Sequence, residues 1–245
     1  MTAPWPSVCT SIVKVEIWSD VVCPWCYIGK RRFEQGLAAF AHRDEVEVIW
    51  RSFELDPDAP RDSGEDTVDR LARKYGMSRD AAVAAQARVT GLAEQEGLTY
   101  RLDRARPANT FDAHRVLHLA ADRGVQGQVK ERLLAAYFTD GRPIGDPETL
   151  AAVAAEAGLD EAAARELLAG DAYAEEVAAD EREAAALGIS GVPFFVVDRR
   201  YGISGAQPAE LIQRALERAW ADANPITVPM PDDGAESCAD GTCTA

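Results

Sequence analysis

Two cysteines three positions apart carry the most distinctive chemistry in this sequence. Cys23 and Cys26 lie in the stretch WSDVVCPWCYIGKRRFEQGL, with Pro24 and Trp25 between them. Thiols at this spacing can bind a metal ion, form a structural disulfide or exchange electrons with another thiol. The elements around the pair decide among these three roles.

The pair is predicted to lie where a strand passes into a helix. Residues 13–18 (VKVEIW) alternate between apolar and charged side chains, which indicates a strand with one buried face. From Cys23 onward the apolar residues recur at helical spacing, and a second strand follows at residues 46–53. This order predicts a βαβ unit with parallel strands, in which a C-x-x-C motif that opens the helix is typical of redox chemistry.

The helix position explains how the two thiols would react. A helix N-terminus has unpaired backbone N–H groups and a partial positive charge, so cysteine thiols in such motifs have pKa values of roughly 3.5 to 7. We therefore predict that Cys23 is an exposed attacking nucleophile and that Cys26, more buried, resolves the mixed disulfide. Pro24 suits the first helical turn because that turn needs no N–H donor there.

A metal site is the main alternative for the pair. A structural zinc ion usually takes four ligands, and this motif supplies two. The remaining candidates, Cys238, Cys243 and the histidines, are distant in the sequence. His114 and His118 share one face of a predicted helix, but no HExxH motif accompanies them. We expect no metal ion.

A second anchor of the predicted site is GISGVPFFVVD, residues 188–198. A strand that opens with proline is unusual within a sheet, because proline cannot donate to the ladder. In a thioredoxin-like fold this place is the cis-proline loop that faces the C-x-x-C motif. We predict a cis bond between Val192 and Pro193, and a backbone at Val192 that pairs with an extended substrate near Cys23. An ordinary trans proline at a strand start is the alternative.

The order of predicted elements gives the fold class. Helical sequence with cap signals, such as Asp146-Pro147, fills the region between the two anchors. We predict an α/β protein with a thioredoxin-like fold and a large inserted all-helical subdomain. The predicted parts are the N-terminal βαβ part (13–58), the inserted subdomain (63–188), the C-terminal ββα part (189–222) and a flexible tail (223–245).

Charge and composition exclude some partners. The 245 residues include 41 acidic and 26 basic side chains, which gives a net charge of -15. Such a field repels nucleic acid and anionic membrane surfaces. No apolar run approaches the roughly 20 residues that cross a bilayer. The start of the sequence shows no basic segment followed by an apolar one, so we expect no secretory signal and a cytoplasmic protein.

Three stretches together resemble the DsbA family of thiol-disulfide oxidoreductases, and within it the FrnE-type branch. They are SDVVCPWCYIGKRRFE, NTFDAHRVLHLA and GISGVPFFV, and the resemblance spans about residues 13–220. It implies a thioredoxin fold with a helical insertion, a dithiol-disulfide site at Cys23 and Cys26, and a cis Pro193 opposite them. It also implies that Asn109 and His114 face the active-site groove, although a helix cap and a partly buried histidine would explain the same residues.

Two other functions stay open beside disulfide exchange or isomerisation on proteins. Kappa-class glutathione transferases and hydroxychromene-carboxylate isomerases share the fold implied by the resemblance, but they use a serine near the position of Cys23. The first alternative is therefore a glutathione-dependent isomerase or transferase for a small aromatic or polyketide-type substrate. The second is a chaperone-like binding protein. In a reducing cytoplasm, a member of the DsbA family would reduce or isomerise disulfides rather than form them.

A second pair of cysteines lies near the end of the sequence. Cys238 and Cys243 flank Ala-Asp-Gly-Thr, in which Asp-Gly is a turn signal, so the two thiols can come within bridging distance. The FrnE-type proteins that the sequence resembles carry a comparable pair, which implies an accessory redox role. An incidental pair without a function is the alternative. We assign no role to Cys9.

The predicted chemistry also sets the expected cofactors and partners. Sulfur carries the electrons, so no organic cofactor is required, and glutathione is the candidate co-substrate. The expected substrates are disulfide-containing proteins or small-molecule thiols, and the contact surface includes Trp25. We expect neither nucleic acid nor a membrane as a partner, and both a monomer and a homodimer stay open.

Overall fold

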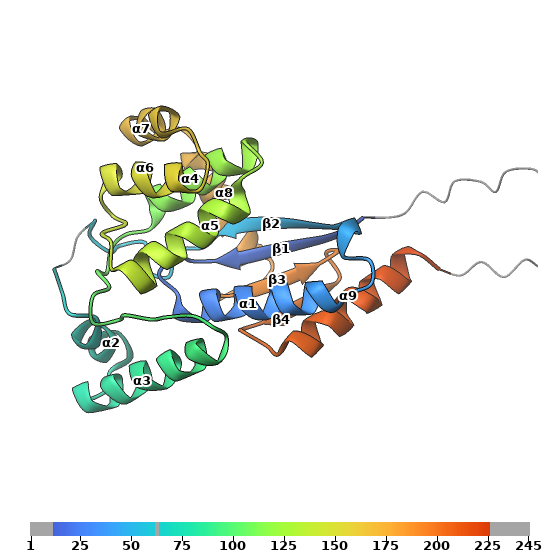
Figure 1. The fold of residues 1–245 in the computed structure, drawn as a ribbon, viewed down its shortest axis with the longest axis horizontal. Helices are drawn as coiled ribbons and strands as arrows, with labels where there is room; N and C mark the ends of the chain where they lie inside the picture. Colours follow the sequence, from blue (N-terminus) through green and yellow to red (C-terminus); the bar gives the residue numbers. More distant parts are fainter. Residues whose placement is uncertain (1–11, 62–63, 226–245) are drawn as a thin grey trace, which may run out of the picture.

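A four-stranded sheet organises the fold in the computed structural model, which describes residues 12–61 and 64–225 (Figure 1). The strands lie side by side in the order β2-β1-β3-β4. β1 and β2 are parallel, whereas β3 is antiparallel to β1 and β4 is antiparallel to β3. The strand bounds are β1 Val13–Ser19, β2 Val46–Ser52, β3 Phe194–Val197 and β4 Tyr201–Ser204.

The N-terminal part is the predicted βαβ unit. Helix α1 (Pro24–Ala39) connects β1 to β2, and a short 3-10 turn (Arg43–Glu45) precedes β2. Val15 pairs with Val48 in the parallel register. The alternation of the first strand and the helical spacing after Cys23 therefore predicted both the elements and their parallel arrangement correctly.

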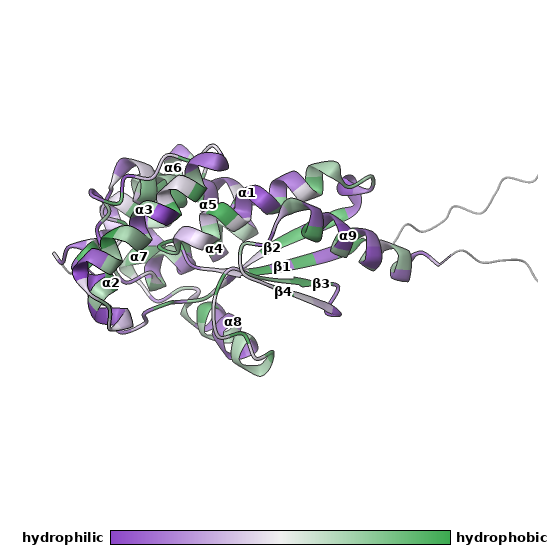
Figure 2. Ribbon diagram, turned by 90° about the horizontal axis from the view of Figure 1, so that it is seen from below, coloured by the Kyte–Doolittle hydropathy of each residue, from purple (hydrophilic) through white to green (hydrophobic). Residues whose placement is uncertain are grey.

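Helices cover both faces of the sheet. Helices α1 and α9 (Ala209–Ala223) lie on one face, and α8 (Ala174–Ala186) lies on the opposite side (Figure 2). On the first face, Ile17 and Phe195 pack with side chains of α1 and α9. On the other face, Trp18 packs with residues near α8. The successive residues Ile17 and Trp18 are buried on opposite faces, which follows from the two-residue period of a strand.

The inserted helices occupy the chain between β2 and β3, as predicted. Helices α2 and α3 pack against each other, and α3 contacts α1, while α4 to α7 pack together. The bounds of these elements are α2 Thr67–Tyr75, α3 Arg79–Gln95, α4 Phe111–Asp122, α5 Gln126–Ala135, a π-helix Ala136–Asp140, α6 Pro147–Glu156, α7 Glu161–Ala169 and α8 Ala174–Ala186. Asp146 caps α6 by accepting a 2.9 Å hydrogen bond from Thr149 N, as its Asp-Pro signal indicated.

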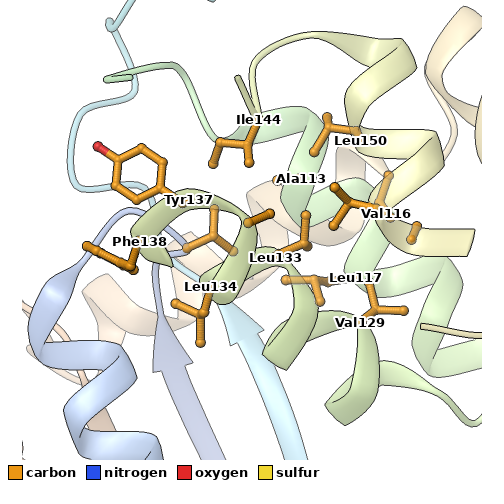
Figure 3. Packing of buried hydrophobic residues seen from close by; sticks show 14 of the residues in the cluster. Ala113, Val116, Leu117, Val129, Leu133, Leu134, Tyr137, Phe138, Ile144 and Leu150 are labelled. Atoms are coloured by element: carbon orange, nitrogen blue, oxygen red, sulfur yellow. The ribbon is translucent and has the colours of Figure 1, made fainter. Parts of the chain in front are cut away.

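The core of the helical insertion extends to the cysteine-bearing helix. Figure 3 shows this core, in which Leu133 lies beside Ala113 and Val116 of α4. Phe138 points to the opposite side, and its ring centre lies 6.2 Å from that of Tyr27 on α1. Val21, just before the cysteine pair, and Ile28 of α1 belong to the same buried cluster. The insertion therefore packs directly behind the N-terminus of α1 and helps to fix it. No helix within residues 12–61 and 64–225 has the length and apolar content needed to cross a membrane.

Candidate active site

The two motif cysteines lie at the N-terminus of α1. Cys23 is the N-cap residue in an extended conformation, and Pro24 occupies the first helical position. The N–H of Cys26 donates a 3.0 Å hydrogen bond to the carbonyl of Cys23, which closes the first turn around the pair. Both thiols are free. This placement is the one that the sequence predicts for a redox pair, since the helix end faces Cys23 with unpaired N–H groups.

The expected exposure of Cys23 was wrong. Its side chain is 3% exposed, and that of Cys26 is 1% exposed. The Sγ of Cys23 lies 3.5 Å from the carbonyl oxygen of Val192, so the proline loop covers it. On the other side, the hydroxyl of Tyr100 donates a 2.6 Å hydrogen bond to the carbonyl of Pro24. Trp25, 41% exposed, is the part of the motif that faces solvent.

The proline loop packs directly on α1. The peptide bond between Val192 and Pro193 is cis, and the carbonyl of Pro193 accepts a 2.8 Å hydrogen bond from Gly205 N. A Cβ atom at Gly29 would lie 2.8 Å from Cγ of Pro193, which is closer than side chains tolerate. Glycine at position 29 therefore lets the loop approach the helix. Gly29 and Pro193, which are 164 positions apart in the chain, thus meet at one site.

The surroundings of Cys26 disfavour its thiolate form. Burial raises the pKa of the Cys26 thiol well above its usual value, and the neighbouring Cys23 raises it further. Lys130 acts in the opposite direction and lowers the pKa of Cys26. At neutral pH the structure therefore keeps Cys26 protonated until something compensates its charge. The role of Cys26 as the resolving thiol stays a prediction.

A cluster of buried polar groups lies behind the pair, in the loop after β1 and on two inserted helices. Asp20 is fully buried, and its Oδ2 accepts a 2.8 Å hydrogen bond from Leu55 N. Its Oδ1 faces Nε2 of His114 at 3.5 Å, which is longer than a hydrogen bond between these atoms. Within the described chain, neither of those two atoms has a hydrogen-bond partner, nor does the hydroxyl of Ser19. Unsatisfied buried polar atoms are rare in folded proteins and mark this cluster as unusual.

Lys130 of α5 completes this cluster. Its side chain is fully buried, and its Nζ lies 3.4 Å from the carbonyl oxygen of Ser19 and 5.6 Å from the ring centre of Trp50. Burial lowers the pKa of Lys130 to about 8, although Cys26 and Asp20 counteract part of that effect. At pH 7 this lysine is therefore mostly a buried cation.

Neither of the two residues predicted from the family motif touches the cysteine pair. His114 is 1% exposed and points at Asp20, so the expectation that it faces the groove was wrong. The amide of Asn109 donates hydrogen bonds to Glu54 Oε2 (3.2 Å) and to Pro57 O (2.9 Å), and its Oδ1 accepts one from Phe111 N. Asn109 thus accepts from the first N–H of α4 and holds the segment after β2.

Asn109 also borders a cavity of about 310 Å³ beside this segment, lined by Glu54, Pro57, Ala59, Arg61, Asn109, Phe111 and Asp112. Burial raises the pKa of Glu54 to about 7, and the nearby carboxylates of Glu181 and Asp20 add to that effect. Arg61 pairs with Asp112 at 2.7 Å on the rim. A substrate contact at Asn109 stays a prediction.

His118 belongs to a different cluster from His114. Its Nε2 lies 3.2 Å from Asp180 Oδ2 and 3.1 Å from Ser52 Oγ. In residues 12–61 and 64–225, no group of three or more His, Cys, Asp or Glu side chains is placed to hold a metal ion. Cys9, Cys238 and Cys243 lie outside the described residues, so the accessory role of the tail pair stays a prediction.

Sequence reasoning missed Asp20, Lys130 and Tyr100. Asp20 ends the strand pattern and reads as an ordinary strand terminator. Lys130 carried a detectable signal, because it directly follows Val129 on the face that also presents Leu133 and Leu134, all of them buried. A lysine on an apolar helix face is a candidate for a buried charge. Tyr100 lies in an irregular segment before α4, and nothing in its sequence neighbourhood points to the cysteines.

Comparison with known proteins gives independent evidence on the family of this chain. A family model described as a DSBA-like thioredoxin domain matches residues 14–217. The structure of a probable DsbA oxidoreductase from Streptomyces coelicolor is 48% identical and has a TM-score of 0.82, covering 95% of this chain and 99% of that one. An uncharacterised Bacillus subtilis protein, YwbO, is 27% identical over 206 residues, which are 83% of this chain and 96% of YwbO.

More distant structures share the fold. The cytosolic disulfide reductase DsbM from Pseudomonas aeruginosa, solved with GSH, is 18% identical with a TM-score of 0.58, covering 84% of this chain and 98% of that one. At this identity the likeness concerns the architecture alone. The thioredoxin-like sheet with an inserted helical block therefore recurs beyond close relatives.

Proposed function

Because the chain belongs to the family of DSBA-like thioredoxin domains, we propose that it is a thiol-disulfide oxidoreductase that acts on protein disulfides through Cys23 and Cys26. One observation carries the proposal. Two free thiols lie at the N-terminus of α1, and the Sγ of Cys23 is 3.5 Å from the backbone carbonyl of Val192. The predicted nucleophilic sulfur and the backbone of the proline loop thus lie side by side.

The reaction proceeds in two exchanges. The thiolate of Cys23 attacks one sulfur of a substrate disulfide, the substrate S–S bond breaks, and the second substrate sulfur leaves with the electron pair. Cys26 then attacks Sγ of Cys23, which releases the first substrate sulfur and forms the Cys23–Cys26 disulfide. The substrate is reduced by two electrons and the pair is oxidised by two. The same steps in reverse oxidise a dithiol substrate.

Several groups around the pair would hold the substrate. An extended peptide can pair with the backbone of Val192 in the manner of an added strand, with Pro193 shaping the loop beneath it. Binding requires the peptide to replace the contact between Cys23 and Val192, which uncovers Sγ. Trp25 offers its exposed ring beside the motif, and Pro24 keeps the first turn free of an N–H donor.

We further propose that the protein works in the cytoplasm as a reductase or isomerase, with glutathione as its co-substrate. The presence of GSH in a solved cytosolic disulfide reductase of the same fold supports this choice. No organic cofactor takes part, because sulfur carries both electrons. Disulfide-containing proteins are the proposed partners, either for a monomer or for a homodimer, and the net charge of -15 disfavours nucleic acid and anionic membranes.

An insulin-reduction assay tests the proposal. Replacing Cys23 by serine removes the nucleophile, so turnover should fall by roughly 10³-fold or more. The Cys26→Ser variant should still attack but stop at a mixed disulfide, detectable by mass spectrometry. Cys9→Ser is the matched control and should keep full turnover. Full activity in Cys23→Ser would overturn the mechanism.

A further inference from the structure

Lys130 is a buried cation that takes no part in the two exchanges of Cys23 and Cys26. Its side chain is fully buried, its hydrogen bond to Ser19 O is long at 3.4 Å, and within the described residues it forms no salt bridge. A buried ammonium without a paired carboxylate destabilises the folded state. Apolar residues would suit this position on α5 better, so the lysine needs another explanation.

The groups that face Lys130 come from every element packed against it. The charges of Cys26 on α1, of Asp20 in the loop after β1 and of Cys23 at the N-cap of α1 favour the charged form of Lys130, and the charge of Lys30 on α1 opposes it. The ring centre of Trp50 on β2 lies 5.6 Å from its Nζ. His114 of α4 and Glu54 at the end of β2 act on it indirectly, because both act on the charge of Asp20. Cys26 is the strongest of these neighbours in favouring the charged lysine.

We propose that Lys130, contributed by the helical insertion, is the buried counter-charge of the Cys26 thiolate in the resolving step. This inference rests on the proposed function. In that step the Cys26 thiol loses its proton, and its sulfur attacks Sγ of Cys23 in the mixed disulfide. The bond between Cys23 and the substrate sulfur breaks, and the Cys23–Cys26 bond forms. The departing substrate thiolate takes the electron pair and finally the proton, so charge and protons balance.

Asp20 supplies the negative charge near Lys130 whenever Cys26 is neutral. While Cys26 is a thiol or part of a disulfide, the carboxylate of Asp20 is the anion that faces the lysine. Its Oδ1 lies 3.5 Å from His114 Nε2 and has no hydrogen-bond partner among the described residues. The carboxylate of Asp20 can therefore adjust its position when the charge at Cys26 changes. Lys130 can therefore supply positive charge to Cys26 without first breaking a salt bridge, since its hydrogen bond goes to the neutral carbonyl of Ser19.

A mixed-disulfide experiment isolates the resolving step. A full-length chain with Cys9, Cys238 and Cys243 replaced by serine is treated with 5,5′-dithiobis(2-nitrobenzoate), so that Cys23 carries thionitrobenzoate. Release of the second thionitrobenzoate, followed by absorbance, reports the attack by Cys26. With Lys130→Met we expect release at pH 7 to slow by about tenfold or more, while the first attack by Cys23 changes by less than about twofold.

The pH profile distinguishes a charge effect from a structural one. With Lys130 present, the rate of release rises with pH as Cys26 ionises, and its slope falls near or above pH 8, where the lysine loses its charge. In Lys130→Met the rate rises along a single curve that is displaced to higher pH. A purely structural lysine would change the rate without displacing the curve.

Lys30→Met is the matched control, because Lys30 is also a buried lysine but pairs with Glu34 and Glu131. Release should not slow in this variant. Release at the wild-type rate in Lys130→Met, or equal slowing in both variants, overturns the inference. Failure of the proposed function looks different, because then Cys23 of the unmodified pair would give no mixed disulfide and no release at all.

Discussion

Glu16 of β1 and Asp20 of the following loop belong to two clusters of buried charge. These clusters differ in how completely their charges are bonded. In the first, which we call the paired cluster, Glu16 bonds to Arg51 and Arg199, and Asp180 bonds to Arg51 at 2.9 Å and to Ser52 N at 2.8 Å. In the second, the underpaired cluster of Asp20, His114 and Lys130, neither Asp20 Oδ1 nor His114 Nε2 has a hydrogen-bond partner among the described residues.

The difference lies in how the buried charges are bonded and in what each cluster can do. Burial disfavours the charge of Glu16, but Arg199 and Arg51 outweigh it and lower the pKa. Such fully bonded charges resist change and fix the packing of the sheet against α8. The underpaired cluster lacks such bonding, and its Lys130 acts on the charge of Cys26. A protein keeps an imperfectly paired buried charge at a cost in stability, so we connect this second cluster to chemistry rather than to folding.

The largest expected effect on stability is in the paired cluster. Asp180→Ala removes a carboxylate that bonds to Arg51, Ser52 N and His118, and it leaves a buried N–H donor unpaired. We expect a loss of about 3 kcal/mol in the free energy of unfolding, measured by urea titration. Thionitrobenzoate release by Cys26 should stay at the wild-type rate below the unfolding transition.

Asp180→Asn is the matched control for this variant. Its amide oxygen still accepts from Ser52 N, so it should lose less stability than the alanine variant. An alanine variant that unfolds at the wild-type urea concentration, or one that changes the rate of release, would contradict the division between the two clusters.

The frame of the fold could be predicted from sequence because its signals are local. Alternation in residues 13–18, the helical spacing after Cys23 and the proline before β3 each depend on a few neighbouring residues, and the structure places all of them as expected. The length of chain between the anchors was enough to predict an inserted helical block. The family match agrees with that architecture.

The environment of the site could not be predicted, because contacts distant in sequence decide it. The position of Cys23 at a helix end is local, but its burial comes from Val192 and Tyr100, 169 and about 77 positions away. His114 looks like a groove residue in its motif, but in the structure it is a buried residue beside Asp20. Sequence periodicity locates a helix face, but it does not show which distant loop will cover it.

Glu54 provides a second, smaller test, because it acts on the underpaired cluster through Asp20. Its pKa is raised to about 7 from 4.5, mainly by burial. Between these two pH values the unfolded chain has already lost the proton that the folded chain still binds, so stability falls as pH rises from 4.5 to 7. Glu54→Gln removes this loss and keeps an oxygen that accepts from Asn109.

We therefore expect Glu54→Gln to gain about 1–2 kcal/mol at pH 8, after allowance for the solvent exposure of this half-buried group, and nothing at pH 4. Urea titrations at the two pH values measure the difference. An equal gain at both would show that the effect is one of packing and that Glu54 carries no buried charge.

The smallest expected change in stability is at Lys130, although this residue has the largest proposed effect on the rate of the resolving step. Burial lowers the pKa of Lys130 from 10.5 to about 8, so between these values the unfolded chain binds a proton that the folded chain has lost. Wild-type stability should therefore rise as pH increases from 8 to 10.5. Lys130→Met should abolish that rise.

At pH 7, Lys130→Met removes a buried charge but also takes a counter-charge from Asp20, and we expect a net gain of about 1 kcal/mol. Lys30→Met, which leaves Glu34 and Glu131 with fewer partners, should instead lose stability. Urea titrations of the reduced proteins at pH 7 and pH 10 measure both. A clear loss of stability in Lys130→Met at pH 7 would show that this lysine stabilises the fold as a paired charge, as Arg51 does. A gain, combined with slow release of thionitrobenzoate, means that the fold retains Lys130 at a cost in stability because Cys26 needs its charge.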